Sequence, residues 1–275
     1  ASGAMADTAA AADATQASKA MNPFFHTSPL PYQFPQFDKI TNADYVPAFE
    51  EGMKQGAAEI EKIANNREKP TFENTIVAME KSGEILDRVS TVFYSLVGTN
   101  TNDEMQAIQA QMAPKLSAYS DAISLNEKLY ARVKALYDQI DDLDLDPESK
   151  RLLERYHTDF VRAGAQLSAE DKAKVKDINS QMATLQTQFS QNVLKEVNAA
   201  AIVVDSKDDL KGMSDSDIAA AAAVAKARGM EGKYVIALLN TSGQPALDSL
   251  SNRALRERIQ KASIARGSQG GEFDN

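Results

Sequence analysis

The sequence predicts a mainly α-helical fold, a multi-helix array with long antiparallel helices and one small β element. Apolar residues recur every three or four positions through most of the region between Asn42 and Ala199, which is the spacing of one helix face. Capping residues, prolines and glycines divide this region into segments of helix length. Only two short runs, at 201–204 and 234–239, are rich in the β-branched residues that favour strands.

Two segments precede the predicted helices. Residues 1–21 are rich in Ala, Ser, Thr and Asp without periodicity, which predicts a disordered tail. Residues 22–41 interleave prolines with aromatic residues and predict an extended arm, because proline disfavours a helix interior. The aromatics favour packing of this arm on the domain surface, and a proline-motif docking site is the alternative.

Residues 42–199 are predicted to form a helical domain. Its helices begin at capping residues or prolines, and Asn42 is expected to cap the first. The predicted helices cover 42–64, 70–99, 103–125, 127–136, 147–163 and 168–199. The last one carries an apolar stripe, which is typical of a core face packed on a neighbouring helix of similar length. The stripe consists of Val175, Ile178, Met182, Leu185, Phe189 and Val193.

Residues 200–275 are predicted to form a mixed segment in which short strands replace long helices. The two β-rich runs are expected to pair in a small sheet, either antiparallel or parallel. The predicted elements are strands at 201–204 and 234–239, helices at 214–228 and 245–265, and a turn at 240–245.

Composition narrows the range of partners. The net charge of the 275 residues is −9, whereas binding to nucleic acid or to an anionic membrane needs clustered Lys and Arg. We therefore expect no nucleic acid and no membrane as partners. The sequence has no cysteine, which excludes disulfides, thiolate zinc ligands and cysteine nucleophiles. A short Ala-rich leader often remains after export, so we expect a periplasmic protein, with the cytoplasm as the alternative.

The residues that could carry catalysis or bind a metal are few. The sequence contains only two histidines, His26 and His157, and no His-Glu-x-x-His. A zinc hydrolase needs several converging His or carboxylate ligands, so we expect no catalytic and no metal-binding residue in this chain. Glu154-x-x-His157 has the spacing of half a di-iron site, which needs a second such pair. No serine-hydrolase elbow, Walker loop or dinucleotide fingerprint is present.

One acidic run needs a separate interpretation. Asp142-x-Asp144-x-Asp146 resembles the start of a calcium-binding loop. The Gly required at the sixth position of that loop and the Glu required at the twelfth are replaced by Pro147 and Leu153, which argues against calcium. We expect instead that Asp146 caps a helix whose first residue is Pro147.

Several motifs, in a fixed order, resemble one family. They are Asn22-Pro-Phe-Phe25, Ser28-Pro-Leu-Pro-Tyr-Gln33, Lys69-Pro-Thr-Phe-Glu-Asn-Thr-Ile76 and Tyr234-Val-Ile-Ala-Leu-Leu-Asn-Thr-Ser-Gly-Gln-Pro245. From about residue 22 to the end, their order and spacing resemble the amino-terminal part of bacterial peptidyl-dipeptidases. These dipeptidyl carboxypeptidases are members of the thimet oligopeptidase and oligopeptidase A family of zinc metallopeptidases.

The resemblance implies both a reaction and a missing part. Enzymes of this kind remove carboxy-terminal dipeptides from short peptides, inside a helical ellipsoid that is split by a deep channel. Their zinc is held by His-Glu-x-x-His and a later glutamate, none of which has a counterpart here, so zinc is expected only in the full-length parent. We expect an amino-terminal fragment, inactive alone, that forms one wall of the substrate channel and has short peptides and the missing catalytic domain as partners. The alternative is a stand-alone helical binding or scaffold protein without catalysis.

The candidates for lining the channel are Asn240, Thr241 and Gln244. A strand end and a turn expose backbone groups that could pair with an extended peptide. The alternative is that these residues cap the strand and start the next helix. Apolar surface that would pack on a catalytic domain also predicts self-association, as a dimer that pairs those surfaces.

Overall fold

The computed structural model describes residues 22–239, 241 and 243–275, so the tail predicted at 1–21 lies outside the described residues. The fold is mainly α with one two-stranded sheet, as predicted. Among the described helices, none combines the length and the apolar character that crossing a bilayer requires.

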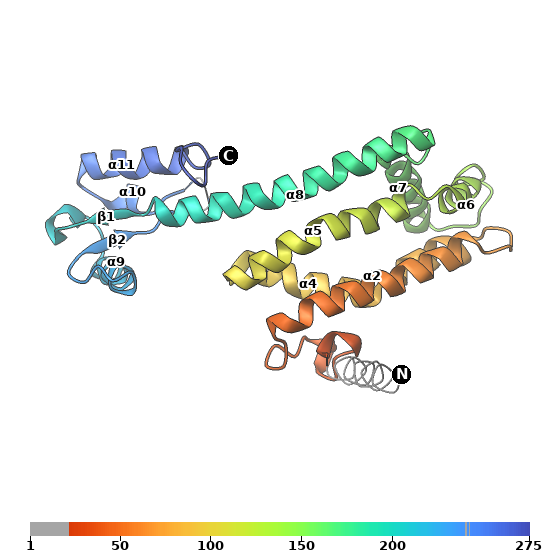
Figure 1. Ribbon diagram of the computed structural model, residues 1–275, viewed down its shortest axis with the longest axis horizontal. Coiled ribbons are helices and arrows are strands. Elements are labelled where there is room, and N and C mark those ends of the chain that lie inside the picture. The colour runs from red at the N-terminus through yellow and green to blue at the C-terminus, as the bar shows by residue number, and fades with distance from the viewer. Residues whose placement is uncertain (1–21, 240, 242) are drawn as a thin grey trace, which may run out of the picture. The chain divides into compact units, whose positions relative to one another are not determined.

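The chain divides into two compact units, one that ends at Thr184 and one that covers Leu185–Asn275. The long helix α8 (Ala169–Ala199) contributes residues to both. In the first unit α2 packs along α4 and α5, and α6 packs against α7 (Figure 1). Besides the first part of α8, this unit contains η1 (Pro23–Phe25), η2 (Pro31–Gln33), α2 (Asn42–Ala64), η3 (Glu73–Val77), α3 (Ala78–Glu80), α4 (Glu84–Thr99), α5 (Asp103–Ser124), α6 (Glu127–Tyr137) and α7 (Pro147–Ala163).

Two apolar clusters hold the first unit together. One joins the start of the arm to α2, α4 and α5, and in it the ring of Phe93 lies 4.9 Å from that of Tyr45 and 5.3 Å from that of Phe49. The other joins α2, α6 and α7 and includes the fully buried Leu129 and Leu153. Burial of each such side chain stabilises the fold by about 1.5–3 kcal/mol, which is why the apolar periodicity predicts these helices.

Some helix starts follow the predicted capping residues and others do not. The helix predicted at 245–265 is divided into α10 (Ala246–Ser249) and α11 (Arg253–Ile264), because Leu250 is extended and Asn252 caps a new helix. The side chain of Asp146 accepts backbone N–H groups of the following turn, as predicted, and that of Asn126 accepts the N–H of Leu129 at the start of α6. Thr41, rather than Asn42, precedes the first helix. Its backbone N–H and its hydroxyl donate to the carboxylate of Asp44, at 2.8 and 2.7 Å. The prediction for Asn42 is wrong by one residue because Thr41 and Asp44 form a capping box.

The single helix predicted at 70–99 is interrupted. It consists of the π-helical turn η3, the short α3 and, after a break at Gly83, α4. Gly83 has φ 78°, a left-handed conformation that glycine adopts without the penalty of a Cβ atom. Its N–H donates to the carboxylate of Glu59 on α2, at 2.8 Å. Periodicity does not reveal this break because Met79 and Val89, on either side of it, are both buried.

The arm at 22–41 packs on the domain at its start and at its end, where the partly buried Ile40 contacts the cluster of α2, α4 and α5. Phe24 is 2% exposed, and its ring lies 5.5 Å from that of Tyr45. The prediction that the aromatics of the arm pack on the domain surface is wrong for three others, whose side chains stay exposed; two of them, Phe34 and Phe37, contact each other with ring centroids 5.7 Å apart. These exposed aromatics are Tyr32, Phe34 and Phe37.

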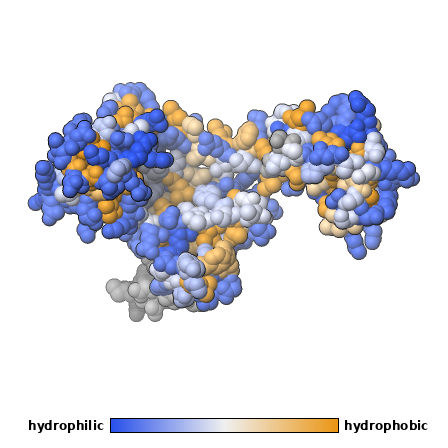
Figure 2. Space-filling view, turned by 180° about the vertical axis from the view of Figure 1, so that it is seen from behind, coloured by the Kyte–Doolittle hydropathy of each residue, from blue (hydrophilic) through white to orange (hydrophobic). Residues whose placement is uncertain are grey.

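The apolar stripe of α8 is not a core face. Its terminal members, Val175 and Val193, are partly buried. The four side chains between them are 48 to 61% exposed, which contradicts the prediction. Helical periodicity shows that a face is apolar and does not show what covers it. The face in Figure 2 carries orange, apolar patches among blue, hydrophilic surface. The exposed members of the stripe are Ile178, Met182, Leu185 and Phe189.

The second unit surrounds the small sheet. Strands β1 and β2 pair antiparallel, with Val203 opposite Val235, which settles the orientation that the sequence left open. Strand β2 ends at Ile236, earlier than predicted, and α9 packs on it (Figure 1). Leu210 and Ile259 are fully buried in the cluster beneath the sheet. The elements are β1 (Ile202–Val204), η4 (Lys207–Leu210), α9 (Asp215–Ala227), β2 (Tyr234–Ile236), α10 (Ala246–Ser249) and α11 (Arg253–Ile264).

Candidate functional site

The predicted channel residues follow strand β2. Asn240 lies outside the described residues. Thr241 is exposed, and its hydroxyl donates to the carbonyl of Gly243 at 3.0 Å. Leu239, directly before the turn, has a side chain that is 45% exposed. An exposed hydroxyl and an exposed apolar side chain therefore stand at the end of the strand.

Gln244 is buried and its side-chain amide is used inside the protein. The side chain is 6% exposed. Its Oε1 accepts the N–H of Leu239, and its Nε2 donates to the carbonyl of Leu239, both at 3.0 Å. Nε2 also lies 3.1 Å from the hydroxyl of Ser263 on α11. Gln244 thus occupies the backbone groups of Leu239 as a neighbouring strand would, which favours the capping role for this residue.

Two residues beyond the turn, Ser263 and Arg266, also hold it, and neither was predicted. Arg266 donates from Nη1 to the carbonyl of Leu239 at 3.1 Å and from Nη2 to the carbonyl of Thr241 at 3.3 Å. Ser263 contributes its hydroxyl from the last turn of α11. Both are tertiary contacts across more than fifteen residues, and only the position of Arg266 just after a predicted helix could have drawn attention to it.

An apolar cleft of about 360 Å³ opens beside the turn, between α9 and β2. Ala220, Ala221 and Val224 line it from the helix, and the cleft is open there because alanine side chains are small. Val235, Leu239 and Gln244 are among the residues that line it from the strand and the turn. A mostly apolar concavity with a few polar groups at one end is the kind of site that takes an apolar side chain.

The cleft contains one carboxylate among its described lining residues, that of Asp217. Its Oδ2 accepts the hydroxyl of Ser214 at 2.6 Å, and its N–H lies 3.2 Å from that hydroxyl, so the pair caps the start of α9. The carboxylate is therefore engaged in capping the helix.

The histidines do not form a metal site. His157 stacks on Tyr137, with the ring centroids 3.8 Å apart, and its Nε2 lies 3.4 Å from the hydroxyl of Tyr130. Burial, and then the charge of Lys134, lower the pKa of His157. His26 is exposed in the arm. Within the described ranges, no three His, Cys, Asp or Glu side chains converge as metal ligands would.

Asp146, the last carboxylate of the acidic run, caps α7, as predicted. The carboxylate of Asp146 accepts the N–H groups of Glu148 and Ser149, both at 2.9 Å. These hydrogen bonds, that of Ser149 first, lower the pKa of Asp146. The side chain is thus the N-cap of α7, with Pro147 as the first helical residue.

Comparison with known proteins adds relatives to this geometry. No protein-family model matches the chain. It is 45% identical to dipeptidyl carboxypeptidase of Escherichia coli over 254 residues and 44% identical to that of Salmonella typhimurium over 253 residues. It is 28% identical to oligopeptidase A of Escherichia coli over 255 residues. These matches cover 90 to 92% of this chain and 37% of each relative, so the chain spans little more than a third of their length. The predicted resemblance is therefore confirmed, and over nine-tenths of its length the chain is homologous to dipeptidyl carboxypeptidases and, more distantly, to oligopeptidase A.

Proposed function

We propose that this chain acts as the amino-terminal part of a zinc metallopeptidase that removes carboxy-terminal dipeptides from short peptides. In that enzyme it forms one wall of the substrate channel, and alone it is inactive. The observation that carries the proposal is the 45% identity to a dipeptidyl carboxypeptidase along 92% of the chain. Short peptides are the proposed substrates.

The cleft beside the turn supports a role in binding peptides. An extended peptide that passes the end of β2 would find the apolar side chain of Leu239 and the exposed hydroxyl of Thr241. An apolar peptide side chain would enter the space that Ala220 and Ala221 leave open. Gln244 would act indirectly, because its amide holds the turn in place.

The described residues of this chain do not supply ligands for the zinc of the proposed enzyme. In the part of the chain that the structure describes, no cluster of three candidate ligands exists, so these residues do not fit a zinc site. The proposed contribution of this chain is therefore binding and orientation of the peptide, and the groups that hold zinc and activate water belong to another part of the enzyme.

A catalytic domain is the proposed protein partner. The four exposed residues of α8 give it apolar surface to cover, and a second copy of this chain is the other proposed occupant.

A periplasmic location is also proposed, motivated by the Ala-rich composition of residues 1–20. Fractionation of cells that express the native gene tests the location, and recovery of the protein with a cytoplasmic marker would contradict it.

A chimera tests the channel-wall role. This chain replaces the matched segment of Escherichia coli dipeptidyl carboxypeptidase, and dipeptide release from a short peptide is followed. Ala220→Leu fills the cleft and is expected to lower kcat/KM about 10-fold, because a few methylenes misplaced in a pocket have effects of this size. Ala223→Leu is the matched control, an exposed alanine of the same helix that does not line the cleft.

The two variants separate the proposal from its alternative. Equal kcat/KM for Ala220→Leu and Ala223→Leu would remove the cleft from the substrate path. A folded chimera without activity, together with peptide binding by the isolated chain, would favour a stand-alone binding protein.

A further inference from the structure

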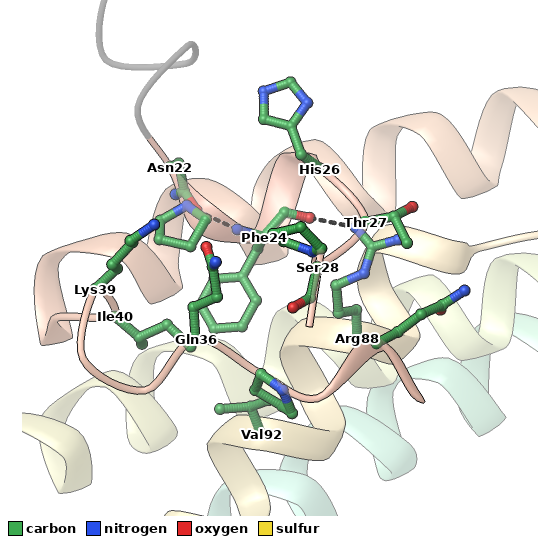
Figure 3. A pocket seen from close by; sticks show the side chains of 14 residues that line it. Asn22, Phe24, His26, Thr27, Ser28, Gln36, Lys39, Ile40, Arg88 and Val92 are labelled. Carbon is green, nitrogen blue, oxygen red and sulfur yellow. Dashed lines mark hydrogen bonds between the residues drawn. The ribbon is translucent and has the colours of Figure 1, made fainter. Parts of the chain in front are cut away.

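The arm encloses a cavity of about 260 Å³ between itself and α4 (Figure 3). The start of the arm is fixed twice. Nη1 of Arg88 donates to the carbonyl of Phe24 at 2.6 Å, and Nδ2 of Asn22 donates to the carbonyl of Asp44 at 2.9 Å. The end of the arm continues into the capped start of α2. Because both ends are held, the space between them is part of the fold.

The middle of the arm has a defined turn. Ser28 donates its hydroxyl to the carbonyl of Phe34 at 2.6 Å and accepts the N–H of Leu30 at 3.2 Å. Tyr32 and Gln33 have φ values of 56° and 57°, which residues with a Cβ atom adopt rarely. Such strained positions often accompany ligand sites, and Gln33 itself lines the cavity.

The lining combines an apolar floor with cations. Phe24, Ile40 and Val92 supply the floor. Lys39 and Arg88 approach from opposite sides (Figure 3). No Asp or Glu is among the described lining residues, although the chain as a whole has a net charge of −9. Glu84, outside the lining, pairs with Arg88, so Lys39 supplies the unpaired positive charge at this cavity.

Lys39 and Arg88 are placed to bind an anion. Nη2 of Arg88 is held by the carboxylate of Glu84 at 2.6 Å, and the guanidinium has five N–H donors, so further donors remain beside the two bonds described. Lys39 forms no ion pair with any described residue, and the side-chain amide of Gln36 likewise has no partner there. An ammonium group, a guanidinium and an amide thus remain available at one cavity.

We propose that this cavity binds a small carboxylate with an apolar body. The carboxylate lies between Lys39 and Arg88, where charge-assisted hydrogen bonds form, and accepts from the amide of Gln36. The apolar body rests on Phe24 and its neighbours in the floor. The volume is below the roughly 300–1,000 Å³ of sites for drug-sized ligands, so the ligand is limited to a single small ring or a short aliphatic chain. This site is separate from the cleft at the end of β2 and does not depend on the proposed peptidase role.

Phenylacetate is a suitable probe, and phenylacetamide is its neutral counterpart of the same shape. Each is titrated into the complete chain to about 20 mM, a range suited to ligands of this size, and amide shifts of residues 22–40 are followed by NMR. We expect saturable shifts with phenylacetate and at least about 10-fold weaker binding of phenylacetamide, because the amide lacks the charge.

Variants at the rim locate the site. Lys39→Gln removes the unpaired cation, and Gln36→Glu places a carboxylate against the ligand. Each is expected to weaken phenylacetate binding about 10-fold. Lys54→Gln is the matched control, a lysine of α2 with a 75% exposed side chain outside the cavity, and should change the affinity less than about 2-fold. Absence of saturable shifts, equal binding of the amide, or unchanged binding by Lys39→Gln would each overturn the proposal.

Discussion

Gln244 should be a structural residue whose loss loosens the turn after β2. Gln244→Ala removes a long hydrogen bond to the carbonyl of Thr241, at 3.4 Å, and three shorter ones, two with Leu239 at 3.0 Å and one with Ser263 at 3.1 Å. A hydrogen bond in a folded protein contributes about 1 kcal/mol net, so losing the three shorter bonds lowers the unfolding free energy by about 3 kcal/mol. The loss should be confined to the second unit, which contains all three residues.

Two assays measure this change. Urea unfolding followed by circular dichroism gives the loss of stability, and hydrogen exchange reports on the amide of Leu239, which should exchange faster once Oε1 is gone. Gln188→Ala, at an exposed position of α8 in the same unit, is the control and should stay within about 0.5 kcal/mol. A stability equal to wild type in Gln244→Ala, with unchanged exchange at Leu239, would refute the claim that the Gln244 side chain holds the turn in place.

Three further predictions follow from the same structure. Gly83→Ala should lower the unfolding free energy by about 1–2 kcal/mol, because a residue with a Cβ atom disfavours φ 78°. The cost is conformational, since the nearest atom to the added Cβ is 3.7 Å away. Thermal unfolding measures the loss of stability, and an unchanged Tm would contradict the prediction. Because the pKa of His157 is lowered in the fold, the unfolded chain takes up the proton first, so stability should fall as pH drops below about 6.5. His157→Phe should reduce that fall between about pH 6.5 and 5, and equal pH profiles would contradict the assignment. The double variant Met182→Glu, Phe189→Glu should reduce binding of a hydrophobic dye and self-association in sedimentation, and wild-type values for both would show that this face of α8 is not the associating surface.

Local chemistry is what the sequence predicts well. Asp146 followed by Pro147 predicts the start of α7, and Asn126 predicts the start of α6, because the caps are formed by side chains within three residues. Thr41 shows the limit of this reasoning, since two adjacent residues can both cap and only the reach of Asp44 decides between them.

Contacts between distant residues are what the sequence does not predict. The stripe of α8 that contains Leu185 and Phe189 has the periodicity of a core face, yet periodicity carries no information about the covering element. The hydrogen bond between Gln244 and Ser263 joins a turn to the helix that follows it. Neither residue carries a sequence signal that predicts the other as its partner. Of the three predicted channel residues, Thr241 remains a candidate for direct contact, Gln244 is occupied, and Asn240 lies outside the described residues.

Release of carboxy-terminal dipeptides is the measurement that tests the proposed function most directly. The isolated chain with added zinc is compared with the chimera in which it replaces the matched segment of Escherichia coli dipeptidyl carboxypeptidase. We predict release by the chimera and none by the isolated chain, because no described residues of this chain form a zinc site. Zinc-dependent release by the isolated chain would contradict the claim that the chemistry lies elsewhere, and a folded but inactive chimera would contradict the claim that these residues form part of such an enzyme.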